Sequence, residues 1–561
     1  MIRMRNHLKS LVNVLKQPDS VLLGLLMLGT VFLYGIIPSM GLAVFGSPDE
    51  TAVAVVADRL AQGNGPAIAD PLVDEYPWLH PRSWISRGEY IVPVGFLGWP
   101  WILSVFNALI AHVAPWVATL LLISSAIPLW KLLESYPRAA RVWALLLYVT
   151  FPSMVLYGNR SLFPNPAELA LALWSTWLIK DLSRAQASGA MAHWSRYLIT
   201  GLAMGACMVI RPIELLWIVP WWVWAGSGSG PLSDLPFSKG RGRMMAVGVA
   251  LVVVPVLVHA GFTYGAPWLS GYQLRDNPPP IVQIQSPPVG TSELTFLPYG
   301  FHPRNILWNV YWFLLNFLMP WSILLIGAAM FPILELWRRR DGLFPSPFSW
   351  RRFATGPFPP LGGGIKGGVC ALWTVFTLLL IYGHGRYADH VSPGAVTIGN
   401  SFLRYLLPIA PLVAWAVAEI WVRADVRRGA RIVATILFAS LATFGSYKAL
   451  AGDDESVLTL RRELIRYASI REAASQWFKP SDVIVSDRSD KIFFPMYRVA
   501  SPTPPLMDLG RLSREEGLSV GLFARPLNQS GKDAWLKAGL DPVELASFGR
   551  ERLYLLRTNR P

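Results

Sequence analysis

Two adjacent carboxylates, Asp49 and Glu50, stand directly after the first apolar segment of the chain. That segment is long enough to cross a bilayer, which takes about 20 apolar residues. A carboxylate held where a membrane meets water is a natural general base, because it can take a proton from a hydroxyl group. The pair therefore indicates acid–base chemistry at a membrane surface.

Local structure alone explains part of this motif. Ser47 and Glu50 fit a capping box, in which the Ser47 hydroxyl accepts from the Glu50 N–H and the Glu50 carboxylate reaches back to the Ser47 N–H. Apolar residues at helical spacing follow, so we expect an amphipathic helix over residues 47–62 on the outer membrane surface. The side chains expected to face the membrane are Val53, Val56 and Leu60. The capping box accounts for the acidic residue at position 50 better than for the one at position 49. By fixing the backbone at the start of the helix, the cap would also fix the direction of the Asp49 side chain.

The composition indicates the class of protein that must position these groups. Of the 561 residues, 53% are hydrophobic and only 15% are charged, whereas soluble proteins carry about a quarter charged residues. The net charge of +15 lies mostly in loops between apolar segments, as the positive-inside rule predicts, so nucleic acid is not an expected partner. We expect an α-helical polytopic membrane protein.

Counting apolar segments predicts about 11 transmembrane helices, each near the length a bilayer requires. The N-terminus and the loop 337–352 should be cytoplasmic, and the loops 46–90 and 264–304 should lie outside. We expect a tight helix pair hinged at Arg211-Pro212 and a single return segment over 306–336. The segment 91–110 is either half-inserted or a short span, and hydropathy does not decide between them.

The C-terminal residues 452–561 have no apolar span and hold charge runs. "ESVLTLRRELIRYASIREAASQWF" favours a helix, whereas "DVIVSD" and "RERLYLLR" favour strands. We therefore divide the chain into a transmembrane domain, 1–451, and a small α/β domain, 452–561, which span parity places outside the inner (plasma) membrane.

Several motifs together resemble the GT-C superfamily of glycosyltransferases, in particular bacterial relatives of protein O-mannosyltransferases and of lipid A aminoarabinose transferases. The first is the "DE" that opens an outer-loop helix ending in "GNG". The others are "GLAMGACMVIRP" (201–212), "FTYGAPWLSGY" (262–272), "LPYGFHPRNILWNV" (297–310) and "SFLRYLLPIAP" (401–411). The likeness covers the membrane region of the chain.

The resemblance implies an enzyme that moves a sugar from a polyprenyl-phosphate donor to an extracytoplasmic glycan, lipid or protein. Asp49, with Glu50 beside it, would be catalytic: Asp49 would deprotonate the acceptor for an inverting displacement. Arg404 would bind the donor phosphate, which a guanidinium can do with two parallel hydrogen bonds.

Three further residues are predicted to bind substrate: Tyr405, Arg82 and Glu168. The second acidic position of the family is occupied by Asn165 here, with Glu168 one turn further on. For Arg211, at the hinge, we expect a structural role.

No metal or cofactor is expected. Asp70, Asp74, Glu75 and His80 lie close together in sequence, but their spacing matches no standard ligand pattern. Cys207 and Cys370 both fall in predicted spans, so neither indicates a disulfide or a metal site.

Two other functions stay open at this point. A secondary transporter or lipid flippase would show repeated halves with broken helices, and no convincing repeat is present. A non-catalytic membrane scaffold would keep the architecture with an inert Asp49.

Overall fold

The computed structural model describes residues 18–188, 192–227, 242–274, 299–328, 364–387, 395–501 and 504–558. The N-terminus and the loop 337–352, both predicted to be cytoplasmic, and most of the loop 264–304 lie outside these ranges. The chain divides into two compact units. We call them the helical unit (1–37, 118–253 and 291–458) and the mixed unit (38–117, 254–290 and 459–561).

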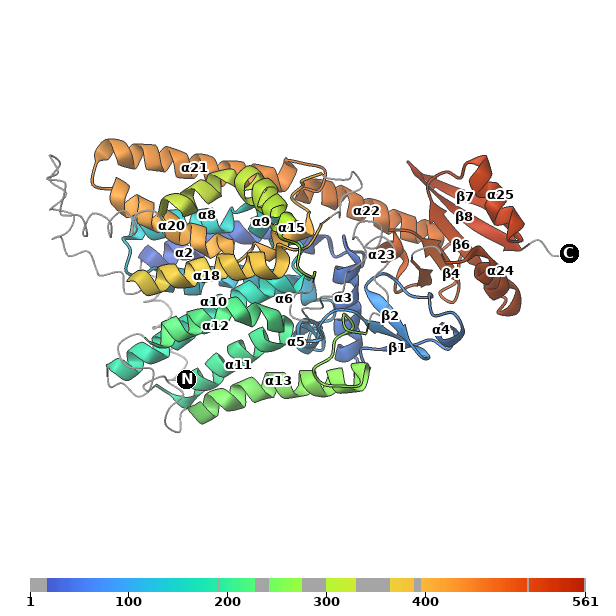
Figure 1. Cartoon of the computed structure of the whole chain (residues 1–561), viewed down its shortest axis with the longest axis horizontal. Helices are drawn as coiled ribbons and strands as arrows, with labels where there is room; N and C mark the ends of the chain where they lie inside the picture. The colour runs from blue at the N-terminus through green and yellow to red at the C-terminus, as the bar shows by residue number, and fades with distance from the viewer. Residues whose placement is uncertain are drawn as a thin grey trace, which may run out of the picture. The chain divides into compact units, whose positions relative to one another are not determined.

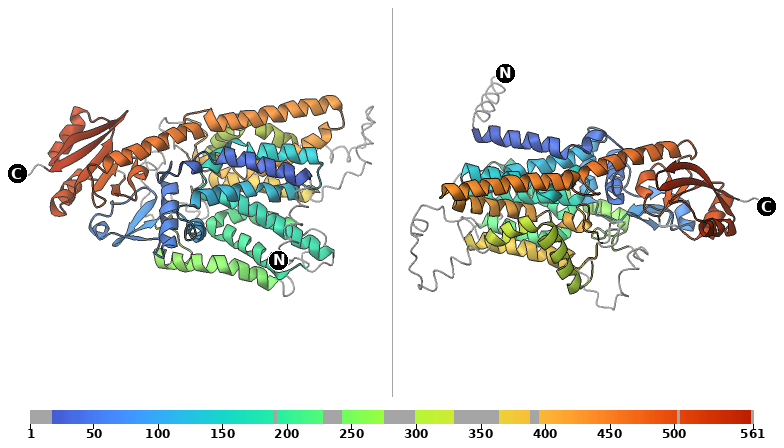
Figure 2. Two further views of the ribbon diagram at one scale, coloured as in Figure 1. Left: turned by 180° about the vertical axis from the view of Figure 1, so that it is seen from behind. Right: turned by 90° about the horizontal axis from the view of Figure 1, so that it is seen from above.

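The helical unit is a bundle whose longer helices run side by side (Figures 1 and 2). Its helices are α2 (Pro18–Tyr34), α7 (Ala126–Leu132), α8 (Arg138–Val149), α9 (Pro152–Asn159), α10 (Pro164–Ala187), α11 (Trp194–Ile210), α12 (Leu215–Gly226), α15 (Pro303–Asn309), the π-helix η4 (Val310–Phe317), α18 (Gly364–Tyr382), α19 (Ser401–Tyr405), α20 (Ile409–Ala424) and α21 (Arg428–Ala451). Three helices contribute to both units: α6 (Ala114–Ser124), α13 (Gly242–Tyr264) and α22 (Val457–Ala474).

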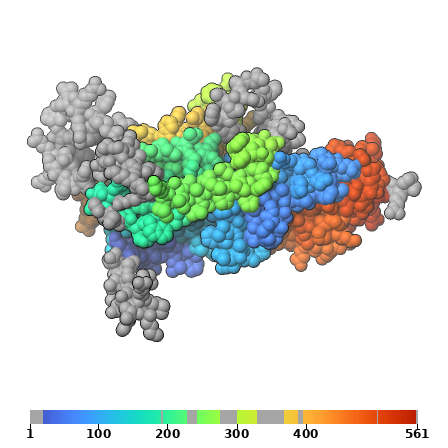
Figure 3. Space-filling view, turned by 90° about the horizontal axis from the view of Figure 1, so that it is seen from below, coloured from blue at the N-terminus to red at the C-terminus, as the bar shows by residue number. Residues whose placement is uncertain are grey.

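Among the described residues, three helical segments are long and apolar enough to cross a membrane: Ala114–Leu132, Gly242–Tyr264 and Arg428–Ala451. Three bent helix pairs raise the number to six if each pair is one span. Helix α13 lies on the face shown in Figure 3 and exposes Val247, Leu251, Val254 and Val258, which suits contact with lipid. The chain is thus a multi-pass membrane protein by these criteria, while the number of about 11 spans stays a prediction.

Two of the bent pairs bear on the predicted topology. Trp194–Ile210 and Pro212–Gly226 meet at 114°, which confirms the tight pair hinged at Arg211. Pro303–Phe317 and Met319–Ala328 meet at 97°, so the described part of the expected return segment over 306–336 is a bent helix pair, which is either a broken span or a re-entrant loop. The π-helix η4 ends at this bend, and Pro320 lies in the first turn of the helix that follows. A proline is tolerated in the first turn of a helix, whereas in the interior of a continuing helix it breaks the hydrogen-bond pattern.

Glycines allow α11 and α13 to approach closely. A Cβ atom on Gly201 would lie 2.0 Å from the Met245 carbonyl oxygen, and one on Gly248 would lie 2.3 Å from the Leu198 carbonyl oxygen. Gly205 completes a small-xxx-small stripe on α11, which is the usual way for membrane helices to bring backbones together.

The first part of the mixed unit is the segment between α2 and α6. It holds α3 (Pro48–Ala61), α4 (Leu72–Glu75), α5 (Gly98–Asn107) and an antiparallel sheet in the order β1 (Ile68–Ala69), β3 (Tyr90–Pro93), β2 (Trp84–Arg87). Helix α5 has 10 residues and rises about 15 Å, half the hydrocarbon thickness, so the segment 91–110 does not span as a helix.

The second part of the mixed unit is a five-stranded sheet with the order β5-β4-β6-β8-β7. The strands are β4 (Val483–Ser486), β5 (Arg498–Ala500), β6 (Val520–Ala524), β7 (Leu540–Phe548) and β8 (Glu551–Thr558). The first three strands in this order are parallel and the other pairs are antiparallel. With α23 (Asp490–Phe493), α24 (Leu506–Glu515) and α25 (Gln529–Lys537), this sheet confirms the expected α/β character of the C-terminal residues.

Candidate functional site

The acidic motif opens a helix, as predicted. Helix α3 follows Ser47, which caps it, and Pro48 occupies its first position. The Ser47 hydroxyl accepts from the backbone N–H of Asp49 at 3.2 Å, one residue earlier than the capping box predicted. The helix ends before Gly63, whose positive φ of 78° favours glycine.

The apolar stripe of α3 faces protein and not only the membrane. Val56 is 1% exposed and Ala57 is fully buried, and α3 packs along α5. The expectation that Val56 faces the membrane is therefore wrong, because α5 offers a second apolar surface that covers it.

The other half of α3 is anchored by Asp58. Its carboxylate accepts from the Asn107 amide of α5 at 2.7 Å and lies 3.4 Å from His112 Nδ1. Burial raises the pKa of Asp58, and the His112 and Asn107 contacts oppose this shift. These contacts fix α3 against α5 and thereby fix the direction of its N-terminus.

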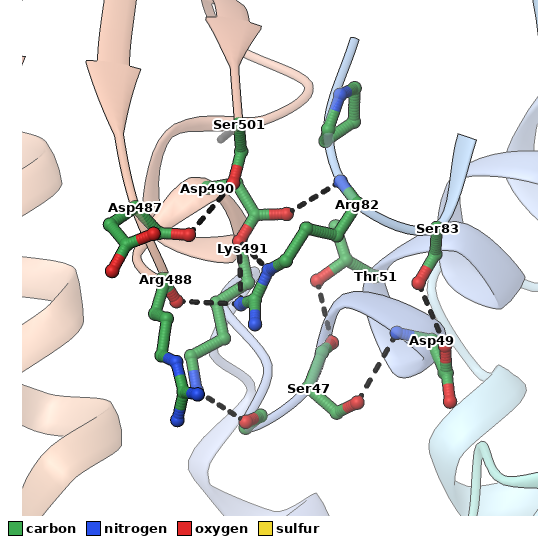
Figure 4. A network of polar contacts seen from close by, with 12 residues as sticks. Ser47, Asp49, Thr51, Arg82, Ser83, Asp487, Arg488, Asp490, Lys491 and Ser501 are labelled. Carbon is green, nitrogen blue, oxygen red and sulfur yellow. Dashed lines mark hydrogen bonds and ion pairs between the residues drawn. The ribbon is translucent and has the colours of Figure 1, made fainter. Parts of the chain in front are cut away.

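The Asp49 carboxylate is half-buried, and the Ser83 hydroxyl donates to its Oδ1 at 2.7 Å (Figure 4). Glu50, on the same turn, is only 4% exposed. A half-buried carboxylate is partly accessible from the protein surface. Asp49 can therefore meet a hydroxyl group that approaches from outside, whereas Glu50 is enclosed by protein.

Arg82 is committed to an ion pair. Its Nε and Nη2 donate to Asp490 Oδ1 at 2.9 and 2.7 Å, and Nη2 also donates to the Arg488 carbonyl oxygen at 2.6 Å. Its backbone N–H donates to Asp490 Oδ2 at 2.9 Å. Figure 4 shows Arg82 beside Ser83, between Asp490 and the start of α3.

A second group of predicted residues meets inside the helical unit. Arg404 and Tyr405 come from α19, and Glu168 comes from the first turns of α10. They line a cavity of about 10 Å³, room for about one water molecule. The other lining residues are Asn165, Leu169, Glu214, Trp217 and Pro408.

Glu168 is the unusual member of this group. Its side chain is buried, with the residue 1% exposed, and neither carboxylate oxygen accepts a hydrogen bond from the described residues. Burying a carboxylate without hydrogen bonds is unfavourable. No contact seen here therefore gives Glu168 a structural reason to be acidic.

Beside this cavity, Arg211 and Glu214 form a buried pair, 3.2 Å from Nε to Oε1. Tyr382 joins them: its hydroxyl accepts from Arg211 Nη2 at 2.9 Å and donates to Glu214 Oε1 at 2.6 Å. The Tyr382 ring stacks on that of Tyr405, with centroids 4.0 Å apart. The network fixes the hinge at Arg211 against α18 and α19.

The structure thus groups the predicted residues into two sets, and each lies within one unit. Asp49, Glu50 and Arg82 belong to the mixed unit, whereas Glu168, Arg404 and Tyr405 share the cavity of the helical unit. Sequence reasoning missed Glu214, although an acidic residue three positions after Arg211 in an apolar run signals an ion pair. It also missed Ser83 and Asp490, for which the sequence carries no local signal.

The acidic residues of the loop before β2 pair with arginines. Asp70 contacts Arg498 Nε at 2.7 Å, and Glu75 contacts Arg511 Nη2 at 2.7 Å. Within the described ranges, no group of three or more His, Cys, Asp or Glu side chains could hold a metal ion.

No protein-family model matches the chain, and no curated protein matches it in sequence. Its fold is nevertheless similar to that of a solved structure. The similarity is to ArnT from Cupriavidus metallidurans, in a crystal structure bound to undecaprenyl phosphate. It covers 95% of this chain and 97% of the ArnT chain, with a TM-score of 0.50 and 11% sequence identity. At this identity the likeness shows the fold, and it confirms the resemblance drawn from the motifs.

Proposed function

We propose that this protein transfers a sugar from a polyprenyl-phosphate donor to an extracytoplasmic acceptor, which is a cell-envelope glycan, a lipid or a protein. The observation that carries the proposal is the fold shared with ArnT over nearly the whole of both chains. Because that ArnT structure is bound to undecaprenyl phosphate, a polyprenyl phosphate is the donor carrier we propose here.

In this proposal Asp49 is the general base. Its carboxylate takes the proton of the acceptor hydroxyl while the acceptor oxygen attacks the anomeric carbon with inversion, and polyprenyl phosphate leaves. Asp49 is half-buried, so its carboxylate is accessible to an acceptor that approaches from outside. Glu50 supports the site from its buried position on the same helical turn.

Arg404 and Tyr405 are proposed to bind the donor phosphate, because the guanidinium balances the charge that develops on the leaving group. Glu168 offers carboxyl oxygens, which suit a sugar hydroxyl or amino group better than a phosphate. The cavity they line, about 10 Å³, is much smaller than a sugar. Donor binding therefore requires these side chains to move apart.

We place the protein in the inner membrane, with Asp49 and the C-terminal domain, 452–561, on the extracytoplasmic side. The positive charge of the predicted inner loops supports this orientation. Nucleotide sugars are cytoplasmic, so a carboxylate outside would not meet them, and a lipid-linked donor would.

The test uses purified full-length protein in proteoliposomes, supplied with a panel of polyprenyl-phosphate sugars and, separately, with nucleotide sugars. We expect turnover with at least one lipid-linked donor and none with nucleotide donors alone. Mass spectrometry of lipids and glycans from a deletion strain identifies the sugar and the acceptor. Transfer from a nucleotide sugar with no lipid intermediate present would refute the proposal, and lipid movement without transfer would favour a flippase.

A further inference from the structure

The ion pair between Arg82 and Asp490 joins residues 408 positions apart in the sequence. Both Asp490 oxygens accept hydrogen bonds, and its side chain is fully buried, whereas that of Arg82 is 26% exposed. Removing one partner of a buried, hydrogen-bonded ion pair strongly destabilises the folded protein, because the remaining charge is left buried and unpaired. The backbone at Arg82 is therefore fixed to the segment that follows β4.

The contacts continue from this point to Asp49. Ser83 follows Arg82 directly, and its hydroxyl donates to Asp49 Oδ1 at 2.7 Å. The next residue after Asp490 makes a second contact: Lys491 Nζ donates to the Gly46 carbonyl oxygen at 2.6 Å, just before the Ser47 cap. Residues 490–491 thus hold both the backbone that leads into α3 and the residue next to the Asp49 partner (Figure 4).

We propose that Arg82 is a positioning residue, through which Asp490 of the C-terminal domain and Ser83 aim the Asp49 carboxylate at the acceptor. The inference rests on the proposed function, in which Asp49 is the base. It gives Arg82 a role different from the direct substrate contact that the sequence analysis predicts. It also gives the C-terminal domain a part in the reaction, since Asp490 belongs to that domain.

The chain offers a matched control for this idea. Arg498 in β5 also pairs with a residue of the segment between α2 and α6: its Nε and Nη2 lie 2.7 and 3.1 Å from the Asp70 oxygens. This ion pair joins the same two parts of the mixed unit, but it does not belong to the contacts that lead from Asp490 to Asp49. Arg498→Gln therefore measures the effect of loosening the domain contact alone.

The experiment measures kcat and donor KM for the full-length protein in proteoliposomes, with the polyprenyl-phosphate sugar that the wild type turns over. Arg82→Gln, Asp490→Asn and their double variant should each lower kcat about 10- to 100-fold, as misplacement of a reacting group does. Donor KM should stay within about threefold. Ser83→Ala removes one hydroxyl and no charge, so it tests the same contacts where the charge variants fail to fold.

The decisive measurement repeats Arg82→Gln in the Asp49→Asn background. A residue that acts through Asp49 should have little further effect there, less than about threefold, because the group it positions is already lost. A residue that contacts substrate, or that only stabilises the fold, should have the same effect in both backgrounds.

Each other outcome overturns a defined part of the argument. Additive losses in the two backgrounds refute positioning and leave the proposed function intact. A raised donor KM with unchanged kcat assigns Arg82 to direct binding, and an equal loss from Arg498→Gln reduces the contact to domain docking. Near wild-type transfer by Asp49→Asn refutes both the base and its positioning.

Discussion

Replacing Asp49 by Asn separates the two roles of the acidic motif. The Asn Oδ1 can still accept from the Ser83 hydroxyl, and the Ser47 cap bonds to the backbone N–H of residue 49, which the substitution leaves unchanged. The charge near the helix N-terminus is lost, which costs about 0.3–1 kcal/mol. The amide cannot take a proton from the acceptor, so transfer should fall at least about 100-fold, or about 2.7 kcal/mol in the barrier.

The assay combines thermal unfolding in detergent with single-turnover transfer from the lipid-linked donor. Glu50→Gln is the comparison, because Glu50 lies on the same turn but is enclosed, with 4% exposure. Its effect on transfer should be smaller than that of Asp49→Asn. If Asp49→Asn transfers sugar at near the wild-type rate while its unfolding is unchanged, Asp49 is not the general base.

Four further predictions concern the helical unit and the topology. Arg404→Ala should lower kcat/KM for the donor about 10- to 100-fold, and Arg404→Lys less, because lysine keeps the charge but loses the two-pronged geometry. Glu168→Gln should change the free energy of unfolding by less than about 1 kcal/mol, since no hydrogen bond from the described residues is lost, while transfer assays should show weaker donor use. Arg211→Leu should destabilise by about 3–5 kcal/mol in thermal unfolding, and adding Glu214→Leu should restore most of it, because the pair is buried. Glu516 is exposed, whereas both native cysteines are buried. An impermeant thiol reagent should therefore label a Glu516→Cys variant in cells with a permeabilised outer membrane, and absence of labelling would refute the outside location.

Local sequence patterns predicted the local elements well. The helix at 47–62, the strands of "DVIVSD" and "RERLYLLR", and the hinge at Arg211-Pro212 all depend on neighbouring residues, and each is present. The bend within the segment 306–336 was not predicted, for a physical reason. Hydropathy averages over a window, so it cannot detect that η4 ends in a bend of 97°.

The site was predictable only in part. Arg404, Tyr405 and Glu168 were chosen from motifs, and they line one cavity. The partners that hold Arg82 and Asp49 were not predictable, since Ser83 is an ordinary loop residue and Asp490 is distant in sequence. Only folding of the C-terminal segment onto the loop brings these groups together within the mixed unit, and one sequence contains no trace of that pairing.

Two buried acidic side chains of the helical unit, Glu214 and Glu168, differ in their hydrogen bonds. Burying a carboxylate is unfavourable unless it accepts hydrogen bonds, and Glu214 meets that condition, because Tyr382 and Trp217 each donate to one of its oxygens. Glu168 does not, because its oxygens accept no hydrogen bond from the described residues. An acidic side chain within a membrane-type helical bundle is a candidate for a functional role by default. Since Glu168 shares its cavity with Arg404, we propose that a polar ligand bonds to both groups, and a sugar phosphate has the hydroxyls for one and the anion for the other.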